Sequence, residues 1–141
     1  MIVDSHQHLW DLEKVEYPWL VPAYGPLYRT FAPSELQPQL AAAGVERTVL
    51  VQAANSYADT DSMLAHAAEH PWIGAVVGWV PLDDAVEAAR VLDSQYLSNH
   101  WFKGVRHLNH EEADPDWLVR PAVIGGLKVL EERGLVYEVV A

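Results

Sequence analysis

The sequence has 141 residues, of which 50% are hydrophobic and 21% charged, the balance of an ordinary globular domain. Its formal net charge of −11 argues against a nucleic-acid partner, because phosphate backbones require clustered lysine and arginine. The lack of cysteine excludes disulfides, thiolate metal ligands and a cysteine nucleophile. No apolar run has the length of a bilayer span and the first residues lack a signal-peptide pattern, so we expect a cytoplasmic protein without membrane contact.

Apolar, strand-like runs alternate with helical patterns along the chain. We expect strands at residues 2–5, 47–53, 73–80, 103–108 and 135–140. Four helices are expected between them: from Ser34, with Gln37 completing a capping box, to Gly44; from about Thr60 to His70, capped by Asp59; from Asp83 or Asp84 to about Asp93; and from Pro121 to near Gly134. This alternation without a hairpin signal predicts right-handed crossovers and a parallel sheet.

Five strands and four helices are compatible with two α/β folds. One is a complete, doubly wound domain of five strands; the other is the first part of a (β/α)8 barrel of the TIM type, which needs about 250 residues. The sequence stops at Ala141 inside a strand pattern, and no glycine-rich phosphate loop follows the first strand. We therefore predict that residues 1–141 are the N-terminal part of a single TIM barrel, truncated after its fifth strand.

His6 and His8 stand at the end of the first predicted strand. Because side chains alternate along an extended chain, both imidazoles point the same way and can grip one divalent metal ion such as zinc, an oxyanion or a carbonyl oxygen. The carboxyl end of a strand is where α/β enzymes place their chemistry. Such a pair also occurs as an accident of packing. Asp4, on the opposite face, either orients the pair or caps a turn.

The remaining candidates follow the other strands or lie in the long segment 7–33. This segment carries aromatic residues, Trp19 among them, and prolines; it forms a lid or wall over a pocket, a loop packed on the barrel rim, or both. Arg106, near the end of the fourth strand, is placed to bind a carboxylate, whereas a structural hydrogen-bonding role suits His107 better. Gln52 can donate to a substrate oxygen or satisfy the backbone, and Trp79 suits a core or pocket wall. We expect the other histidines, His66, His70, His100 and His110, to be surface or capping residues without metal-ligand spacing.

Taken together, several segments resemble a known family. They are Val3–Trp10, Tyr17-Pro18-Trp19-Leu20, Val49–Ala53, Gly78-Trp79-Val80, Lys103–His107, Asp116-Trp117-Leu118 and Arg120-Pro121. In order and over essentially the whole chain, they resemble the amidohydrolase-related lactonases, in particular the branch of L-fuconolactonase and 2-pyrone-4,6-dicarboxylate lactonase.

The resemblance implies a TIM barrel that hydrolyses the ester bond of a sugar or carboxylated lactone, a small-molecule substrate. His6 and His8 would polarise the carbonyl directly or through a divalent ion, and Arg106 would hold a substrate oxygen or carboxylate. Further candidates for contact with the substrate are Gln52, Trp79, Trp19 and His107. The family's later histidine and its aspartate base belong to the second half of the barrel, so this chain should be nearly inactive. Two alternatives remain: a metal-dependent decarboxylase of the same superfamily, and a non-catalytic half-barrel that forms a homo-oligomer through its open edges.

Overall fold

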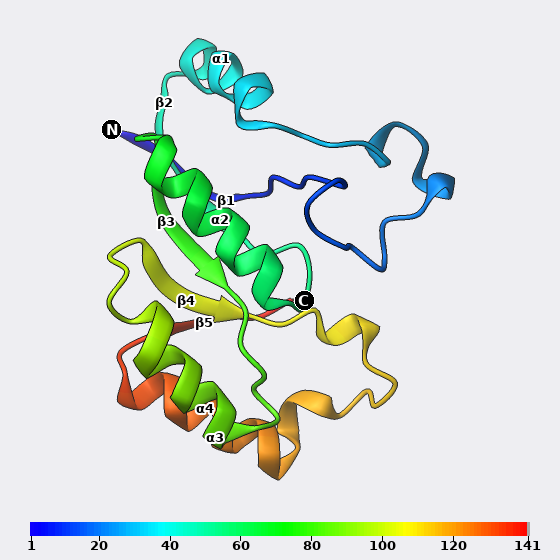
Figure 1. The fold of residues 1–141 in the computed structure, drawn as a ribbon, viewed down its shortest axis with the longest axis vertical. Coiled ribbons are helices and arrows are strands. Elements are labelled where there is room, and N and C mark those ends of the chain that lie inside the picture. Colours follow the sequence, from blue (N-terminus) through cyan, green and yellow to red (C-terminus); the bar gives the residue numbers. More distant parts are fainter. Residues whose placement is uncertain (141) are drawn as a thin grey trace.

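The computed structural model describes residues 1–140, which form one parallel sheet with helices between its strands (Figure 1). The strands are β1 (Ile2–Gln7), β2 (Val45–Val51), β3 (Ile73–Gly78), β4 (Phe102–Arg106) and β5 (Val136–Glu138). The helices are α1 (Pro33–Ala43), α2 (Tyr57–Glu69), α3 (Ala85–Val91), which runs on into a π-helical turn at Leu92–Tyr96, and α4 (Pro121–Glu132). Among the described residues, no helix has the length and apolar character needed to cross a membrane.

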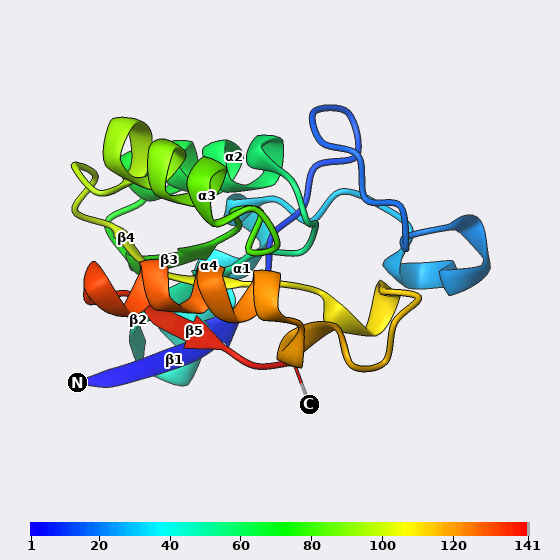
Figure 2. The ribbon, with the colours of Figure 1, turned by 90° about the horizontal axis from the view of Figure 1, so that it is seen from below.

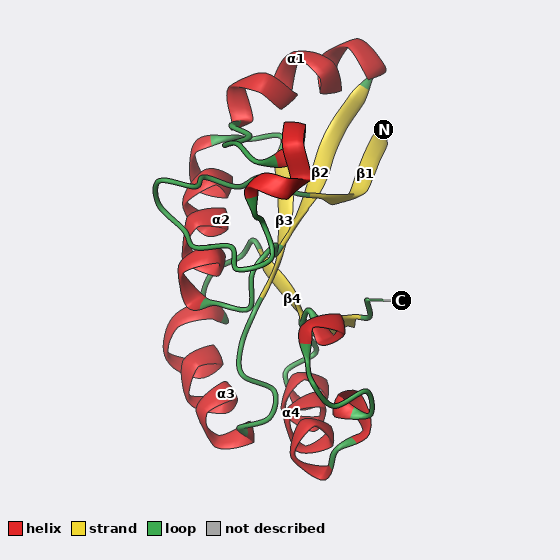
Figure 3. Ribbon diagram, turned by 90° about the vertical axis from the view of Figure 1, so that its right-hand side faces the viewer, coloured by secondary structure: helices red, strands yellow, loops and turns green. Residues whose placement is uncertain are grey.

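The order of the strands decides between the two folds. It is β1-β2-β3-β4-β5, with every neighbouring pair parallel. Right-handed crossovers in a sheet of consecutive order place every helix on the same face, whereas a doubly wound sheet reverses its order and is covered on both. The helices accordingly line one side of the curved sheet (Figure 3). The predicted half of a TIM barrel is confirmed, and the doubly wound alternative is wrong.

Helix ends follow local sequence signals, with two exceptions. Asp84 caps α3 and Pro121 opens α4, as predicted. The cap predicted at Asp59 is wrong, because α2 begins three residues earlier and its cap is Ser56, whose hydroxyl accepts from the Asp59 amide. The capping box predicted at Ser34 is also wrong, since α1 begins at Pro33 and Glu35 accepts from the Ala32 amide instead.

The apolar core is divided into three clusters along the sheet. One lies beneath α3 and α4 around Tyr96, Phe102 and Trp117. The second lies beneath α1 and α2 and includes Leu50 and Met63. The third holds the long segment after β1, which extends beyond the body of the domain (Figure 2). The helices thus stabilise the strands from outside, and the carboxyl ends of the strands are left for polar side chains.

The long segment after β1 is both packed and part of a pocket wall, so the two expectations hold together. Val15, Tyr17 and Leu20 are buried against the loop after β2. Trp10 forms an isolated antiparallel bridge with Phe31, and its indole donates to the Arg29 carbonyl. These contacts fix the two ends of the segment to each other, which places its aromatic side chains over the carboxyl edge of the sheet.

Candidate active site

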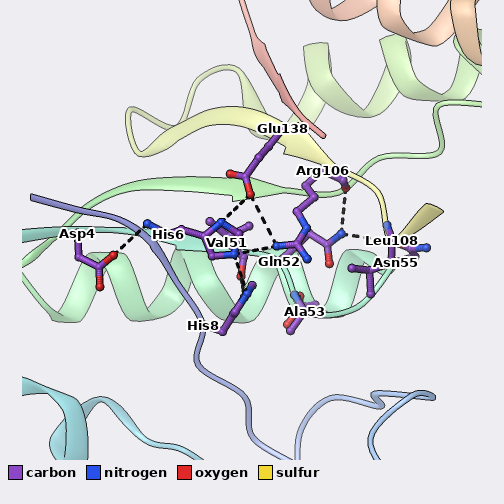
Figure 4. Close-up of polar contacts among 11 residues, drawn as sticks. Asp4, His6, His8, Val51, Gln52, Ala53, Asn55, Arg106, Leu108 and Glu138 are labelled. Carbon is purple, nitrogen blue, oxygen red and sulfur yellow. Dashed lines mark hydrogen bonds and ion pairs between the residues drawn. The ribbon is translucent and has the colours of Figure 1, made fainter. Parts of the chain in front are cut away.

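Three polar side chains converge at the carboxyl edge of the sheet, each from a different strand (Figure 4). Arg106 is the last residue of β4, and its Nη1 lies 3.0 Å from His6 Nε2. Glu138, the last residue of β5, binds His6 Nδ1 at 2.8 Å and lies 3.7 Å from Arg106. β1 and β5 are the two edges of the sheet, so this contact requires strong curvature. The side chains therefore meet across the mouth of the half-barrel.

The two histidines of the first strand face each other through their Nε2 atoms, which are 2.9 Å apart. His8 Nδ1 lies 2.8 Å from the Val51 carbonyl, an acceptor, so this nitrogen carries the ring proton of a neutral His8. The Nδ1 of His6 is held in the same way by the Glu138 carboxylate. The Nε2 of neutral His8 therefore carries a lone pair that can accept a hydrogen bond in the mouth.

Burial sets the charge of this group. Burial lowers the pKa of His8 to about 4. The bond to the Val51 carbonyl acts against this shift, and the nearby Arg106 and His6 act in the same direction as burial. His8 is therefore a neutral imidazole at pH 7. Burial also lowers the pKa of Arg106 from its usual value, an effect that the Glu138 carboxylate opposes. Its Nε is buried and has no hydrogen-bond partner among the described residues.

A pocket of about 270 Å³ lies directly beside this cluster. Its lining combines polar and aromatic side chains: His8, Trp10, Trp19, Ala53, Arg106, Leu108 and His110. Trp19 is fixed by a 2.6 Å hydrogen bond from its indole to the Ala53 carbonyl and packs edge-on against Trp10. The volume suits a small ligand, with one cationic end at Arg106 and an aromatic wall opposite.

The structure brings together four of the seven predicted site residues and separates the other three. His8, Trp19 and Arg106 line the pocket, and His6 borders the adjoining hollow with Arg106 and Glu138. Gln52, Trp79 and His107 follow their strands as predicted, but their side chains make structural contacts and do not line the pocket. Gln52 is fully buried and donates to the Arg106 carbonyl, which fixes the end of β4.

His107 occupies a structural position behind the pocket. Trp79 donates its indole proton to His107 Nδ1 at 3.0 Å, and His107 Nε2 lies 2.8 Å from Glu112. The ring stacks on Trp117 with centroids 3.8 Å apart. Burial lowers the pKa of His107, although Glu112 acts in the opposite direction. This arrangement agrees with the hydrogen-bonding role favoured for His107 from the sequence, and it places both Trp79 and His107 outside the pocket lining.

Sequence reasoning missed several residues. Glu138 was overlooked, although the rule that placed Arg106 at a strand end applies equally to β5. His110 is exposed, as predicted, but it also lines the pocket, together with Trp10 from the segment predicted to cover it. The statement that His66 and His70 lack metal-ligand spacing is wrong, because donor atoms of His66, Glu69 and His70 lie within 4.8 Å of one another. Asp4 accepts from the His6 amide, which is the turn-capping role.

Comparison with known proteins agrees with this architecture. An L-fucono-1,5-lactonase of Burkholderia ambifaria is 31% identical over 136 residues, covering 96% of this chain and 46% of that protein. Another, from Burkholderia multivorans, is 33% identical over 138 residues, covering 97% and 46%. A crystal structure of a Burkholderia multivorans amidohydrolase with bound zinc superposes with a TM-score of 0.86 at 30% identity, covering 100% of this chain and 49% of that one.

The chain thus spans about half the length of the curated relatives it matches. The model of the amidohydrolase family Amidohydro_2 matches residues 3–141, which include all of the sheet except Ile2 and every polar residue of the mouth. The chain therefore belongs to the Amidohydro_2 family of amidohydrolases.

Proposed function

We propose that this chain supplies the carbonyl-polarising side of a lactonase active site, in a protein that hydrolyses the ester bond of a sugar or carboxylated lactone. The observation that carries the proposal is the convergence of Arg106, His6 and His8 beside a small pocket with tryptophan walls. Sugar rings offer apolar faces to indoles and hydroxyl groups to imidazoles, so the chemistry of the lining suits this class. The likeness to L-fucono-1,5-lactonases supports the same choice.

In lactone hydrolysis, water adds to the ring carbonyl, the ring C–O bond breaks, and the proton of the water passes to the leaving alkoxide. The carbonyl oxygen becomes negatively charged during addition. The Arg106 guanidinium is placed to stabilise this charge, because it lines the pocket and is largely shielded from water. The neutral His8 presents an Nε2 lone pair that accepts from a substrate hydroxyl. Glu138 orients His6 through the 2.8 Å contact.

The histidine pair also fits half of a divalent metal site. Each Nδ1 is held by a carbonyl or carboxylate, which is the usual outer support of metal-bound histidine, and both Nε2 atoms aim at one point. His6 and His8 would hold the ion, and a bound zinc would polarise the lactone carbonyl. Two nitrogens fall short of the three protein ligands usual for catalytic zinc. The Arg106 guanidinium, 3.0 Å from His6 Nε2, repels a cation there, which weighs against the metal-dependent decarboxylase.

No described residue is placed as a free base that activates water. The Glu138 carboxylate is engaged by His6 and Arg106, and a pKa of about 4 makes His8 a weak base at pH 7. General base catalysis commonly contributes about 10²–10⁴-fold to the rate. We therefore expect this chain to bind lactone and product but to hydrolyse lactone about 10²–10⁴-fold more slowly than full-length relatives do.

The test separates binding from turnover. L-Fuconate, the stable aldonate product, should quench or enhance tryptophan fluorescence in a saturable way, because Trp10 and Trp19 line the pocket. Arg106→Met should weaken this binding about 10–100-fold, the loss of a charged hydrogen bond worth about 1.5–3 kcal/mol. Arg47→Met is the matched control, since Arg47 is an exposed arginine of β2. Absence of saturable binding, or equal affinity in the Arg106 variant, would overturn the proposal. Lactone hydrolysis, followed by acid release, tests the turnover expectation separately.

Self-association is a second candidate property, and the sheet edges support it. Ile2 and Val3 on β1, and Val136 on β5 with Val139 beyond it, leave 45–62% of their surface exposed. Apolar side chains beside unpaired strand edges favour pairing with another chain. We propose that this chain forms a homo-oligomer through these edges. Size-exclusion chromatography with light scattering should give a monodisperse dimer. A chain that stays strictly monomeric at about 0.1 mM protein would contradict this proposal.

A further inference from the structure

A second group of metal-ligating side chains lies at the far end of the domain. His66, Glu69 and His70 come from the last turn of α2 and its C-cap. Residues three and four apart share one face of a helix, so these three side chains are neighbours. Their nitrogen and oxygen donor atoms all lie within 4.8 Å of one another, and the two imidazole centroids are 6.2 Å apart. α2 starts at the carboxyl edge of the sheet and ends at the opposite edge, away from His6 and His8 (Figure 1).

Two imidazoles and one carboxylate are ligands that zinc and other borderline divalent metals accept. Ligand atoms on one tetrahedral zinc ion are about 3.3 Å apart, as bonds of about 2.0–2.1 Å require. The donor atoms, which now lie up to 4.8 Å apart, can approach to about 3.3 Å by side-chain rotation alone. Such rotation is possible because none of the three side chains is fully buried. Within residues 1–140, no hydrogen bond or ion pair occupies the ring nitrogens of the two histidines or the Glu69 carboxylate. The donors are therefore available.

The surroundings favour a cation at this point. The last carbonyl groups of a helix lack partners and give its C-terminal end a partial negative charge, which attracts positive charge. Trp72 packs beside His70 with ring centroids 5.6 Å apart, which restricts the motion of that imidazole.

We propose that His66, Glu69 and His70 form a divalent transition-metal site that clamps the end of α2, independently of the lactonase chemistry at the strand ends. The ligand class is a borderline ion, with Cu²⁺ bound more tightly than Zn²⁺ or Ni²⁺. The position, at the amino-terminal edge of the sheet, suits a stabilising role, because this face of a barrel maintains structure while the opposite face carries chemistry.

Zinc titration of the metal-free 141-residue chain tests the proposal. Histidine ring resonances in NMR spectra report each imidazole separately, so binding at α2 is distinguished from binding at His6 and His8. Zinc should shift or broaden the signals of His66 and His70 together, at the same equivalence point, and raise the unfolding temperature. His66→Asn with His70→Asn should abolish both effects, and Glu69→Gln should weaken binding about tenfold.

His100→Asn is the matched control, because His100 is an exposed histidine in the turn before β4. It should leave the zinc response of His66 and His70 unchanged. The proposal is overturned if zinc leaves the signals of His66 and His70 in place, or if the double variant keeps the stabilisation by zinc while the signals of His6 and His8 do not respond. A response of only one of the two rings would show a single-histidine contact, which also contradicts a shared site.

Discussion

Replacing Asp59 with alanine should strongly destabilise the protein and loosen the pocket. The carboxylate of Asp59 is 1% exposed and accepts three hydrogen bonds. Its Oδ2 accepts from the amides of Ala53 and Ala54 at 2.7 and 3.1 Å, and its Oδ1 accepts from the Tyr17 hydroxyl at 3.0 Å. Asp59 thus joins the loop after β2, which lines the pocket at Ala53, to the long segment that carries Trp19.

The size of the effect follows from the donors that lose their partner. Each buried polar group left unsatisfied costs about 1–3 kcal/mol, so Asp59→Ala, with three such donors, should lower the free energy of unfolding by about 3–5 kcal/mol after some relaxation. Asp59→Asn keeps the side-chain volume and one acceptor oxygen for the two amides, and should cost only about 1 kcal/mol. Tyr17→Phe removes one bond to the carboxylate and should cost about 1.5 kcal/mol.

Urea unfolding followed by tryptophan fluorescence measures these differences. In a double-mutant cycle, Asp59→Ala and Tyr17→Phe should be non-additive by about 1 kcal/mol or more, because the two side chains share one hydrogen bond. The reasoning is refuted if Asp59→Ala lies within about 0.5 kcal/mol of the wild type, or if the two substitutions are strictly additive within that margin.

The same residue gives a pH dependence of known sign. Burial raises the pKa of Asp59 above 3.8, despite the opposing amide and hydroxyl hydrogen bonds. The native state therefore holds this proton more firmly than the unfolded chain does, and the free energy of unfolding falls as pH rises from 3.8 through the native pKa. Asp59→Asn should remove this component, and an unchanged slope in the variant between pH 4 and pH 7 would count against it.

Three further outcomes can be checked with the same unfolding and fluorescence assays. Gly126→Ala should cost about 3 kcal/mol, because its Cβ would lie 2.1 Å from the Leu82 carbonyl oxygen, whereas Gly125→Ala, with 3.5 Å to its nearest neighbour, should gain about 0.5 kcal/mol in helix propensity. Trp19→Phe should weaken L-fuconate binding about threefold or more, since it loses the hydrogen bond to Ala53 that fixes the pocket wall. His107 has a lowered pKa, so the unfolded chain binds its proton first and stability falls as pH drops below 6.5; His107→Phe should flatten that slope.

Each of these outcomes has a clear contrary result. Equal stability of the two glycine variants would mean that α4 does not pack on the backbone at Leu82. Unchanged affinity in Trp19→Phe would remove this indole from the pocket wall. An acid-induced loss of stability identical in His107→Phe would assign that loss to other groups.

The position of the mouth could be predicted from the sequence, because the carboxyl ends of parallel strands meet at one edge. Arg106 and His8 were found by that rule alone, and both line the pocket. The orientation of the residues that follow the strands was beyond such a rule. The Arg106 carbonyl holds the Gln52 side chain away from the pocket, and the Trp117 ring holds His107 in the same way. Neither contact is visible in a local sequence pattern, because Gln52 and Arg106 are 54 residues apart and Trp117 follows His107 only after an irregular loop.

Two errors had different causes. Ser56 and Asp59 are equally good capping residues by type, but only Ser56 caps α2. The Asp59 carboxylate is held inside the domain by Tyr17, which lies 42 residues away. No local pattern reveals that contact. The pair His66 and His70 could have been recognised, by contrast, since a spacing of four places two side chains on one helical face.

The contact between His6 and Glu138 shows how the fold and the site depend on each other. These residues belong to the first and last strands of the sheet, so their 2.8 Å contact exists only while the sheet curves. Arg106, from the strand beside β5, reaches the same imidazole and reinforces the curvature. Flattening the sheet would break both contacts of the His6 imidazole, whereas Arg106 and Glu138, which lie on adjacent strands, would stay paired with each other. The polar residues of the mouth therefore help to hold the half-barrel in the shape that brings them together, and substituting any one of them should alter stability as well as binding.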